Sequence, residues 1–294
     1  FVYSCKSIIC MRYFLPVLLI FIFPLMLNGQ APFPNSDEIK QFSSSKTCVV
    51  LEDDPFSAFN VYIKEAMGDF WKITPYEFIN VKEFNVRRLD PSWSFIVLTE
   101  TNFSKDRSNS VYNFINLIQG KDVDKLSENP EICAVPLSFA GEDDLEYVYK
   151  LGAILSFMQK HANLIIEDPS KTGRRYLRFY NENVPEILNR TILIKKEDLS
   201  ADINSIEKIR AIYKGRVEIV SEEEIVNAIE TKRPATVILH KVSPPAEFKN
   251  SGYCFKMLIG TDDSNMYYYN EHLIDRRNPD GFLPADLRRL ARFD

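Results

Sequence analysis

The sequence TCVVLEDD at residues 47–54 begins a pattern that recurs later in the chain. Its apolar run and acidic residues are followed by an amphipathic segment, a second apolar run (YEFI, residues 76–79), a short acidic helix candidate and two strand-like segments ending near residue 118. A second series of the same kind starts with TILI at residues 191–194. Thr47 and Thr191 lie 144 positions apart, and Phe84 and Ile225, like Tyr112 and Tyr253, lie 141 apart. A nearly constant offset across several segments predicts a duplicated structural unit.

Each series predicts the element order β-α-β-α-β-β-β-α. Two helical crossovers between strands imply a parallel core, and the hairpins that follow add antiparallel strands. We therefore expect an α/β fold of two tandem, related units, each a mixed sheet with helices packed on it. The expected units cover residues 47–168 and 191–294, with a helical connector at residues 169–190. An apolar helix near residues 143–166 should end the first unit and be largely buried.

Residues 1–30 carry the pattern of an export signal. Arg12 precedes an apolar run at residues 13–27 that contains two prolines, and small and polar residues follow it. This order is typical of a secretory signal peptide, whereas a transmembrane helix needs about 20 apolar residues without such breaks. We expect a periplasmic or extracellular protein that has no membrane span after cleavage. Residues 31–46 should form an extended polar leader.

Charge and cysteine content exclude several classes of protein. Removing the first 29 residues removes Lys6 and Arg12 and no acidic residue, so the formal charge goes from −5 to −7. Binding to nucleic acid relies on Lys and Arg to neutralise phosphates, and we expect no such partner. The remaining cysteines are Cys48, Cys133 and Cys254. Their odd number and the lack of a CxxC motif argue against a disulfide framework, although one pair with a leftover thiol stays open.

We expect no cofactor and no metal. The chain contains neither a GxGxxG nor a P-loop motif, and its three histidines lack the spacing of a metal-binding pair on a helix. His240 ends a predicted strand and could form a thiol–imidazole pair with Cys254 if their strands align. No nucleophile-elbow sequence accompanies the two residues, so the alternative is an inert buried thiol.

Four further groups of side chains are candidates for binding. Glu52 and Asp53 follow the first strand, at the edge where α/β sheets often bind ligands, and such carboxylates could hold a hard cation. The alternative is that Asp54 caps the next helix and its neighbours are solvated, as Asp198 would do in the second unit. Asp262 and Asp263 could also hold a hard cation, but a hairpin turn is the simpler explanation for them, because aspartate is common in turns.

Arg174 and Arg175 belong to a basic stripe that could face an acidic glycan or a phosphate-rich lipid headgroup, or could be a solvated helix face. Tyr267 and Tyr268, with other tyrosines of the predicted strands, could form an exposed aromatic platform for a sugar or peptide. The alternative is alternate packing of residues that favour strands, because neighbouring side chains on a strand point to opposite faces.

Several short motifs resemble a family of uncharacterised exported proteins of Gram-negative bacteria. They are VVLED (residues 49–53), TPYEFI (74–79), LHKV (239–242), Ile259-Gly260 before Tyr267-Tyr268, and DGFL (280–283). The resemblance covers nearly the whole chain after the signal and implies no activity. In topology alone, each half is also similar to the periplasmic modules of the curli-secretion lipoprotein and to the amino-terminal domain of the Tol–Pal translocation protein. It lacks the lipidated cysteine of the former and the propeller repeats of the latter.

Two functional hypotheses follow. The first is an exported, non-enzymatic binding or assembly module whose partner, an envelope protein or a glycan, lies in a cleft between the two units. The second is a hydrolase that uses clustered carboxylates or the Cys254–His240 pair. The position of Cys254 Sγ relative to His240 distinguishes the two.

Overall fold

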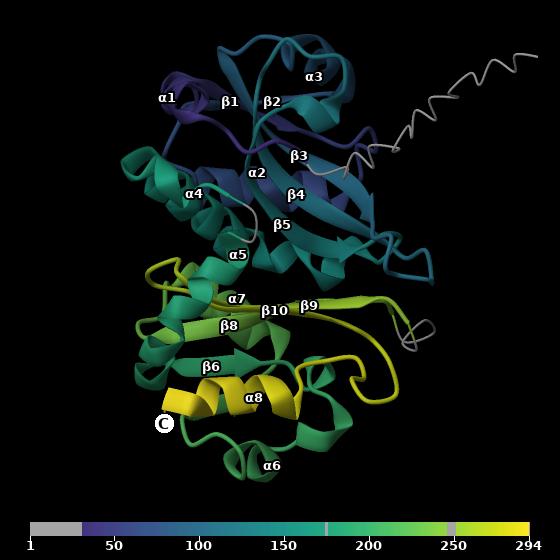
Figure 1. Ribbon diagram of the computed structural model, residues 1–294, viewed down its shortest axis with the longest axis vertical. Helices are drawn as coiled ribbons and strands as arrows, with labels where there is room; N and C mark the ends of the chain where they lie inside the picture. Colours follow the sequence, from purple (N-terminus) through teal and green to yellow (C-terminus); the bar gives the residue numbers. More distant parts are fainter. Residues whose placement is uncertain (1–30, 174–175, 246–250, 294) are drawn as a thin grey trace, which may run out of the picture. The chain divides into compact units, whose positions relative to one another are not determined.

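The computed structural model of the chain describes residues 31–173, 176–245 and 251–293 (Figure 1). It contains two five-stranded mixed sheets with helices packed against them, as the sequence predicts. The first sheet has the strand order β2-β1-β3-β4-β5, and the second has the order β10-β9-β8-β6-β7. When the second sheet is described from its other edge, its order is β7-β6-β8-β9-β10, so β6 to β10 occupy the same places as β1 to β5 in the first sheet.

The first sheet and its helices come before residue 168. In chain order the helices and strands are α1 (Ser36–Ser44), β1 (Lys46–Val50), α2 (Ala58–Phe70), β2 (Tyr76–Ile79), α3 (Val81–Arg87), β3 (Trp93–Asn102), β4 (Val111–Gln119), β5 (Glu131–Phe139) and α4 (Leu151–Glu167). β1 is parallel to β2 and β3, while β4 is antiparallel to β3 and β5.

The second sheet follows a connector whose described residues form three short helices: the 3₁₀ helix η4 (Pro169–Lys171), α5 (Tyr176–Phe179) and the 3₁₀ helix η5 (Tyr180–Asn189). Its elements are β6 (Thr191–Ile194), α6 (Ile206–Arg210), β7 (Arg216–Ile219), α7 (Glu222–Glu230), β8 (Thr236–Val242), β9 (Tyr253–Gly260), β10 (Met266–Leu273) and α8 (Pro284–Leu290). β6 is parallel to β7 and β8, and the hairpins are antiparallel, as in the first sheet.

Strand register shows how closely the two sheets correspond. Phe95 faces Ile118 across β3 and β4, and Val237 faces Gly260 across β8 and β9. Val237 comes 142 positions after Phe95, and Gly260 comes 142 positions after Ile118. This offset places Tyr112 level with Cys254 and not with Tyr253, so the sequence alignment is displaced by one residue in this strand. The shared order and register suggest an internal repeat.

The apolar helix predicted near residues 143–166 is α4, which begins only at Leu151, after two 3₁₀ helices at Asp144–Glu146 and Val148–Lys150. It is largely buried, as its broad apolar surface predicts. Leu151, Leu155 and Met158 have no exposed surface and belong to one cluster of buried side chains. The same cluster includes residues of both sheets, such as Val49 in β1 and Ile238 in β8. Packed apolar side chains therefore fill this part of the contact between the two units.

Residues 36–44 form helix α1, so the prediction of an extended leader is wrong for this segment. Asn35 caps the helix, because its side chain accepts hydrogen bonds from the backbone of Asp37 and Glu38. Ile39 and Phe42 are buried in the core. The polar composition of the segment concealed two apolar residues at helical spacing, which are enough to attach one face of a helix.

The starts of α2 and α6 also differ from the prediction. Ser57 caps α2 through a hydrogen bond from Asn60 N to Ser57 Oγ of 3.2 Å, whereas Asp54 closes the preceding turn by accepting from Phe56 N. In the second unit Ser205 caps α6, and Asp198 is buried. Serine and aspartate satisfy the same free backbone donors, so the sequence could not decide which of them does so here.

The predicted signal peptide lies outside the described residues. Within the part of the chain that the structure describes, no helix is both long and apolar enough to cross a membrane. Export remains a prediction.

Candidate functional site

The carboxylates predicted at the end of the first strand are exposed. Glu52 Oε2 accepts a hydrogen bond from Ser57 Oγ at 2.5 Å, and Asp53 points to solvent in the same loop. Asp144 also reaches this loop, because its Oδ2 accepts from Phe59 N at 3.2 Å. Nowhere in the described ranges do three or more His, Cys, Asp or Glu side chains form a group that could hold a metal ion. Glu52 helps to close the turn into α2.

The predicted Cys–His pair does not form. His240 Nε2 donates to Pro136 O in β5 at 2.9 Å, and Cys254 Sγ contacts Gly281 O at 3.8 Å. Burial, with a smaller effect of Lys150, lowers the pKa of His240 to about 3, and burial raises the pKa of Cys254 to about 12. A buried neutral thiol with a separate partner is not an activated nucleophile. The three cysteines Cys48, Cys133 and Cys254 are free and buried.

Tyr267 and Tyr268 do not form an exposed platform, because each is only 1% exposed. Tyr267 donates to Asp263, and Tyr268 donates to Asp286 at 2.6 Å. The alternative of alternate packing on the strand is therefore the correct one. Arg174 and Arg175 lie outside the described residues.

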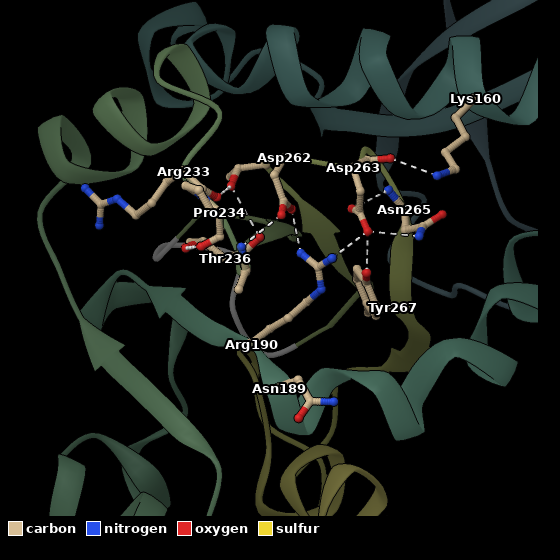
Figure 2. Close-up of polar contacts among 12 residues, drawn as sticks. Lys160, Asn189, Arg190, Arg233, Pro234, Thr236, Asp262, Asp263, Asn265 and Tyr267 are labelled. Atoms are coloured by element: carbon tan, nitrogen blue, oxygen red, sulfur yellow. Dashed lines mark hydrogen bonds and ion pairs between the residues drawn. The ribbon is translucent and has the colours of Figure 1, made fainter.

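Asp262 and Asp263 form the predicted hairpin turn between β9 and β10, and a single arginine neutralises both (Figure 2). Arg190 Nη1 and Nη2 are each 2.6 Å from one carboxylate, and the guanidinium lies over the ring of Tyr267, 4.5 Å from its centroid. Partial burial alone would raise the pKa of Asp262, but the hydrogen bond from Arg190 holds it below its usual value. Lys160 of α4 donates to Asp263 O, which joins the turn to the first unit.

Arg190→Lys is expected to lower the free energy of unfolding by about 1–3 kcal/mol. A lysine ammonium is a point charge that cannot contact two carboxylates in parallel or stack on Tyr267. Urea unfolding followed by circular dichroism measures the change. Arg210→Lys, at an exposed position in α6, is the matched control and should have little effect. Equal stability of the two variants would show that the two parallel contacts of the Arg190 guanidinium with Asp262 and Asp263 do not stabilise the protein.

A buried ionic cluster joins the two units near the start of α4. Lys150 Nζ lies 4.0 Å from Asp198 Oδ2, while Lys241 Nζ lies 3.8 Å from Asp198 Oδ1 and 3.1 Å from Asp280 Oδ2. Burial lowers the pKa of Lys150; it acts on Lys241 in the same sense, but Asp198 and Asp280 raise the pKa of Lys241 overall. Asp198 Oδ2 and His240 Nδ1 are buried without a hydrogen-bond partner. Because all of these groups are enclosed, we interpret the cluster as a connection between units.

An open surface pocket of about 450 Å³ lies where the β3–β4 hairpin meets the end of β5. We call it the hairpin pocket. Its lining residues are Glu100, Ser108, Asn109, Ser110, Val111, Phe139, Ala140 and Ser251. The volume is within the range of small-molecule sites, roughly 300–1,000 Å³. Both units contribute, because Ser251 precedes β9 of the second sheet.

A hydrogen-bond network holds the polar side of the hairpin pocket. Ser108 Oγ is 2.5 Å from Asp106 Oδ1 and 2.6 Å from Ser110 Oγ. Asp106 is 4% exposed, and its Oδ2 is buried without a hydrogen-bond partner. Asn109 has a φ of 54°, in the left-handed region that asparagine tolerates better than most residues. The hydroxyl groups are thus positioned by the fold of the hairpin itself.

The opposite side of the hairpin is attached to the second sheet. Tyr112 Oη accepts from Tyr253 N at 2.6 Å and donates to Tyr253 O at 3.2 Å. Phe103 lies in the same hairpin, and its ring centroid is 4.9 Å from that of Tyr253 and 5.6 Å from that of Phe255. Such aromatic pairs add about 0.5–1.5 kcal/mol each beyond their burial. These contacts attach the hairpin that lines the pocket to the second sheet.

The residues of the hairpin pocket were not among the sequence-based candidates. The available signal was DRSNS at residues 106–110, a polar run in a hairpin loop longer than a tight turn requires. Such loops on a rigid scaffold often carry function. The sequence could not show that Phe139 and Ser251 complete the same pocket.

No protein-family model, curated protein or solved structure matches the chain. The resemblance to exported Gram-negative proteins remains a prediction from short motifs.

Proposed function

We propose that this protein is an exported binding module that holds a small ligand, free or as part of an envelope glycan, in the hairpin pocket. One observation carries the proposal: an open pocket combines hydroxyl and amide groups with an apolar wall of Val111, Phe139 and Ala140. Binding sites typically combine such a wall with a few placed polar groups. Export is proposed from the signal-peptide pattern of residues 1–30.

The location differs from the cleft that the duplication suggested. The two units share packed core around α4, and the hairpin pocket lies at the margin of their contact, where Tyr112 meets Tyr253. A ligand there would touch both units through Ser110 and Ser251. Binding is favoured over the Cys–His hydrolase, because Cys254 and His240 have separate partners.

Native mass spectrometry of the purified protein with a small-molecule fraction of bacterial envelope tests the proposal. The wild-type protein is expected to carry an adduct that Ala140→Trp abolishes, since the indole fills the pocket. Ala201→Trp, at an exposed position in the second unit, should retain the adduct. No adduct on the wild-type protein, or one that survives in Ala140→Trp, would refute binding in the pocket. Steady conversion of a component of the fraction would favour the hydrolase instead.

A further inference from the structure

Assuming that the hairpin pocket is the binding site, we propose that its ligand is an uncharged sugar residue. Three features of the lining carry this inference: the kind of polar group, the lack of a cationic side chain among its described residues, and the apolar wall.

The polar groups match a ligand that both donates and accepts hydrogen bonds at several positions. Ser251 offers one donor and two acceptor lone pairs, and the Asn109 amide offers two donors and an acceptor. The Ser108 hydroxyl already donates to Asp106 Oδ1 and shares a hydrogen bond with Ser110 Oγ, so these two hydroxyls serve a ligand mainly as acceptors. The Glu100 carboxylate only accepts, and its two oxygens suit a pair of neighbouring hydroxyl groups. A sugar presents hydroxyl groups that serve as donor and acceptor on adjacent carbons, so it can satisfy all of these groups together.

The charges of the lining disfavour anions. Among the lining residues that the structure describes, none is Lys, Arg or His, and Glu100 brings one negative charge. A phosphate or carboxylate would lose its hydration without the charge-assisted hydrogen bonds that such groups obtain from arginine. Asp106, beneath Ser108, adds a buried carboxylate oxygen without a hydrogen-bond partner.

The wall of the pocket suits the C–H face of a sugar ring. Val111, Phe139 and Ala140 are partly exposed in the lining, and Phe139 is held edge-on against Tyr112 at a centroid distance of 5.6 Å. A sugar ring has carbon-bound hydrogens on its faces and hydroxyl groups on its rim. It can therefore place a C–H face against this wall and its hydroxyl groups against the serines. The hydrogen bonds among Asp106, Ser108 and Ser110 hold part of the polar lining in place, which reduces the ordering needed on binding.

Isothermal titration calorimetry with glucose, galactose, mannose and N-acetylglucosamine, and with a linear oligomer of each, tests the sugar class. At least one sugar is expected to bind. Glu100→Gln should weaken it about tenfold, as loss of one charge-assisted hydrogen bond does. The matched control Glu65→Gln, at an exposed position in α2, should bind like the wild-type protein. Ala140→Trp should abolish binding and Ala201→Trp should not. Tighter binding of an oligomer than of its monomer would identify a glycan chain as the source, and equal binding a free sugar.

Two results would overturn the sugar class while leaving the binding function intact. In the first, the envelope adduct is lost in Ala140→Trp, but no sugar binds and the adduct mass is not that of a carbohydrate. In the second, the free amine cadaverine binds more tightly than every sugar and loses its affinity in Glu100→Gln, which would indicate a cationic ligand. If a sugar binds equally to Ala140→Trp and to the wild-type protein, the hairpin pocket is not its site.

Discussion

Lys256→Met is expected to lower the free energy of unfolding by about 3–5 kcal/mol, as removal of one partner from a buried ion pair usually does. Lys256 in β9 and Asp286 in α8 both have 0% exposure, and Nζ lies 2.6 Å from Oδ2. Without the ammonium, the carboxylate stays buried with hydrogen bonds from neutral donors such as Tyr268 Oη and Leu283 N. Urea unfolding followed by far-UV circular dichroism measures the loss.

Two comparisons make this result specific to the pair. Lys208→Met removes an exposed lysine of α6 and should change stability by less than about 0.5 kcal/mol. The double variant Lys256→Met with Asp286→Asn should be more stable than the sum of the single changes predicts, by about 1 kcal/mol or more. A loss below about 1 kcal/mol for Lys256→Met alone would contradict a stabilising role for the pair.

The architecture could be predicted because the strands of the parallel core are buried on both faces. Such strands are continuous apolar runs. TCVV and TILI, the first strand of each series, therefore indicate the repeat. The hairpins follow from connections too short to contain a crossover helix, and β3–β4 and β8–β9 confirm this. Apolar patterning is local information, so a single sequence contains it.

The roles of charged residues could not be predicted in the same way. Lys256 stands in the middle of the apolar run YCFKMLIG, which indicates that its ammonium group needs a buried partner. The neighbouring sequence does not identify that partner as Asp286, which lies 30 positions later. Asp198 has the sequence context of a helix cap, and it is buried between Lys150 and Lys241. Pairing of this kind depends on how α4, β8 and the segment after β6 meet in space.

The candidate site escaped sequence reasoning for the same reason. Ser110 and Ser251 line one pocket although they are 141 positions apart. Conversely, Tyr267 and Tyr268 looked available for a ligand because alternation exposes one face of a strand, but neighbouring segments cover both faces here. Asp263 accepts the hydroxyl of one ring and Asp286 that of the other.

Stability is expected to fall as the pH decreases from about 6.5 to about 4.5, because two histidines are buried in the neutral form. Burial lowers the pKa of His161 to about 4 and, together with Lys150, that of His240 to about 3. Their pKa values in the folded state are below the unfolded value of 6.5, so the unfolded chain binds more protons in this window. Each site then removes about 1.4 kcal/mol per pH unit.

Glu131 opposes part of this loss. Burial raises the pKa of its carboxyl group to about 7, above the unfolded value of 4.5, so its protonation favours the folded state over the same window. The net effect of the three groups is a loss of about 2 kcal/mol between about pH 6.5 and about pH 4.5. Two histidines outweigh one carboxyl group, so the histidines should set the sign of the slope.

Comparison of slopes isolates the contribution of each histidine. In His240→Gln the amide nitrogen can still donate to Pro136 O, but it cannot take up a proton. Urea unfolding at a series of pH values should therefore show a slope smaller than that of the wild-type protein by about 1.4 kcal/mol per pH unit. His272→Gln should change the slope less, because the His272 ring is only half-buried whereas that of His240 is 1% exposed. An unchanged slope in His240→Gln would mean that its imidazole becomes protonated in the folded state despite its burial and the nearby Lys150.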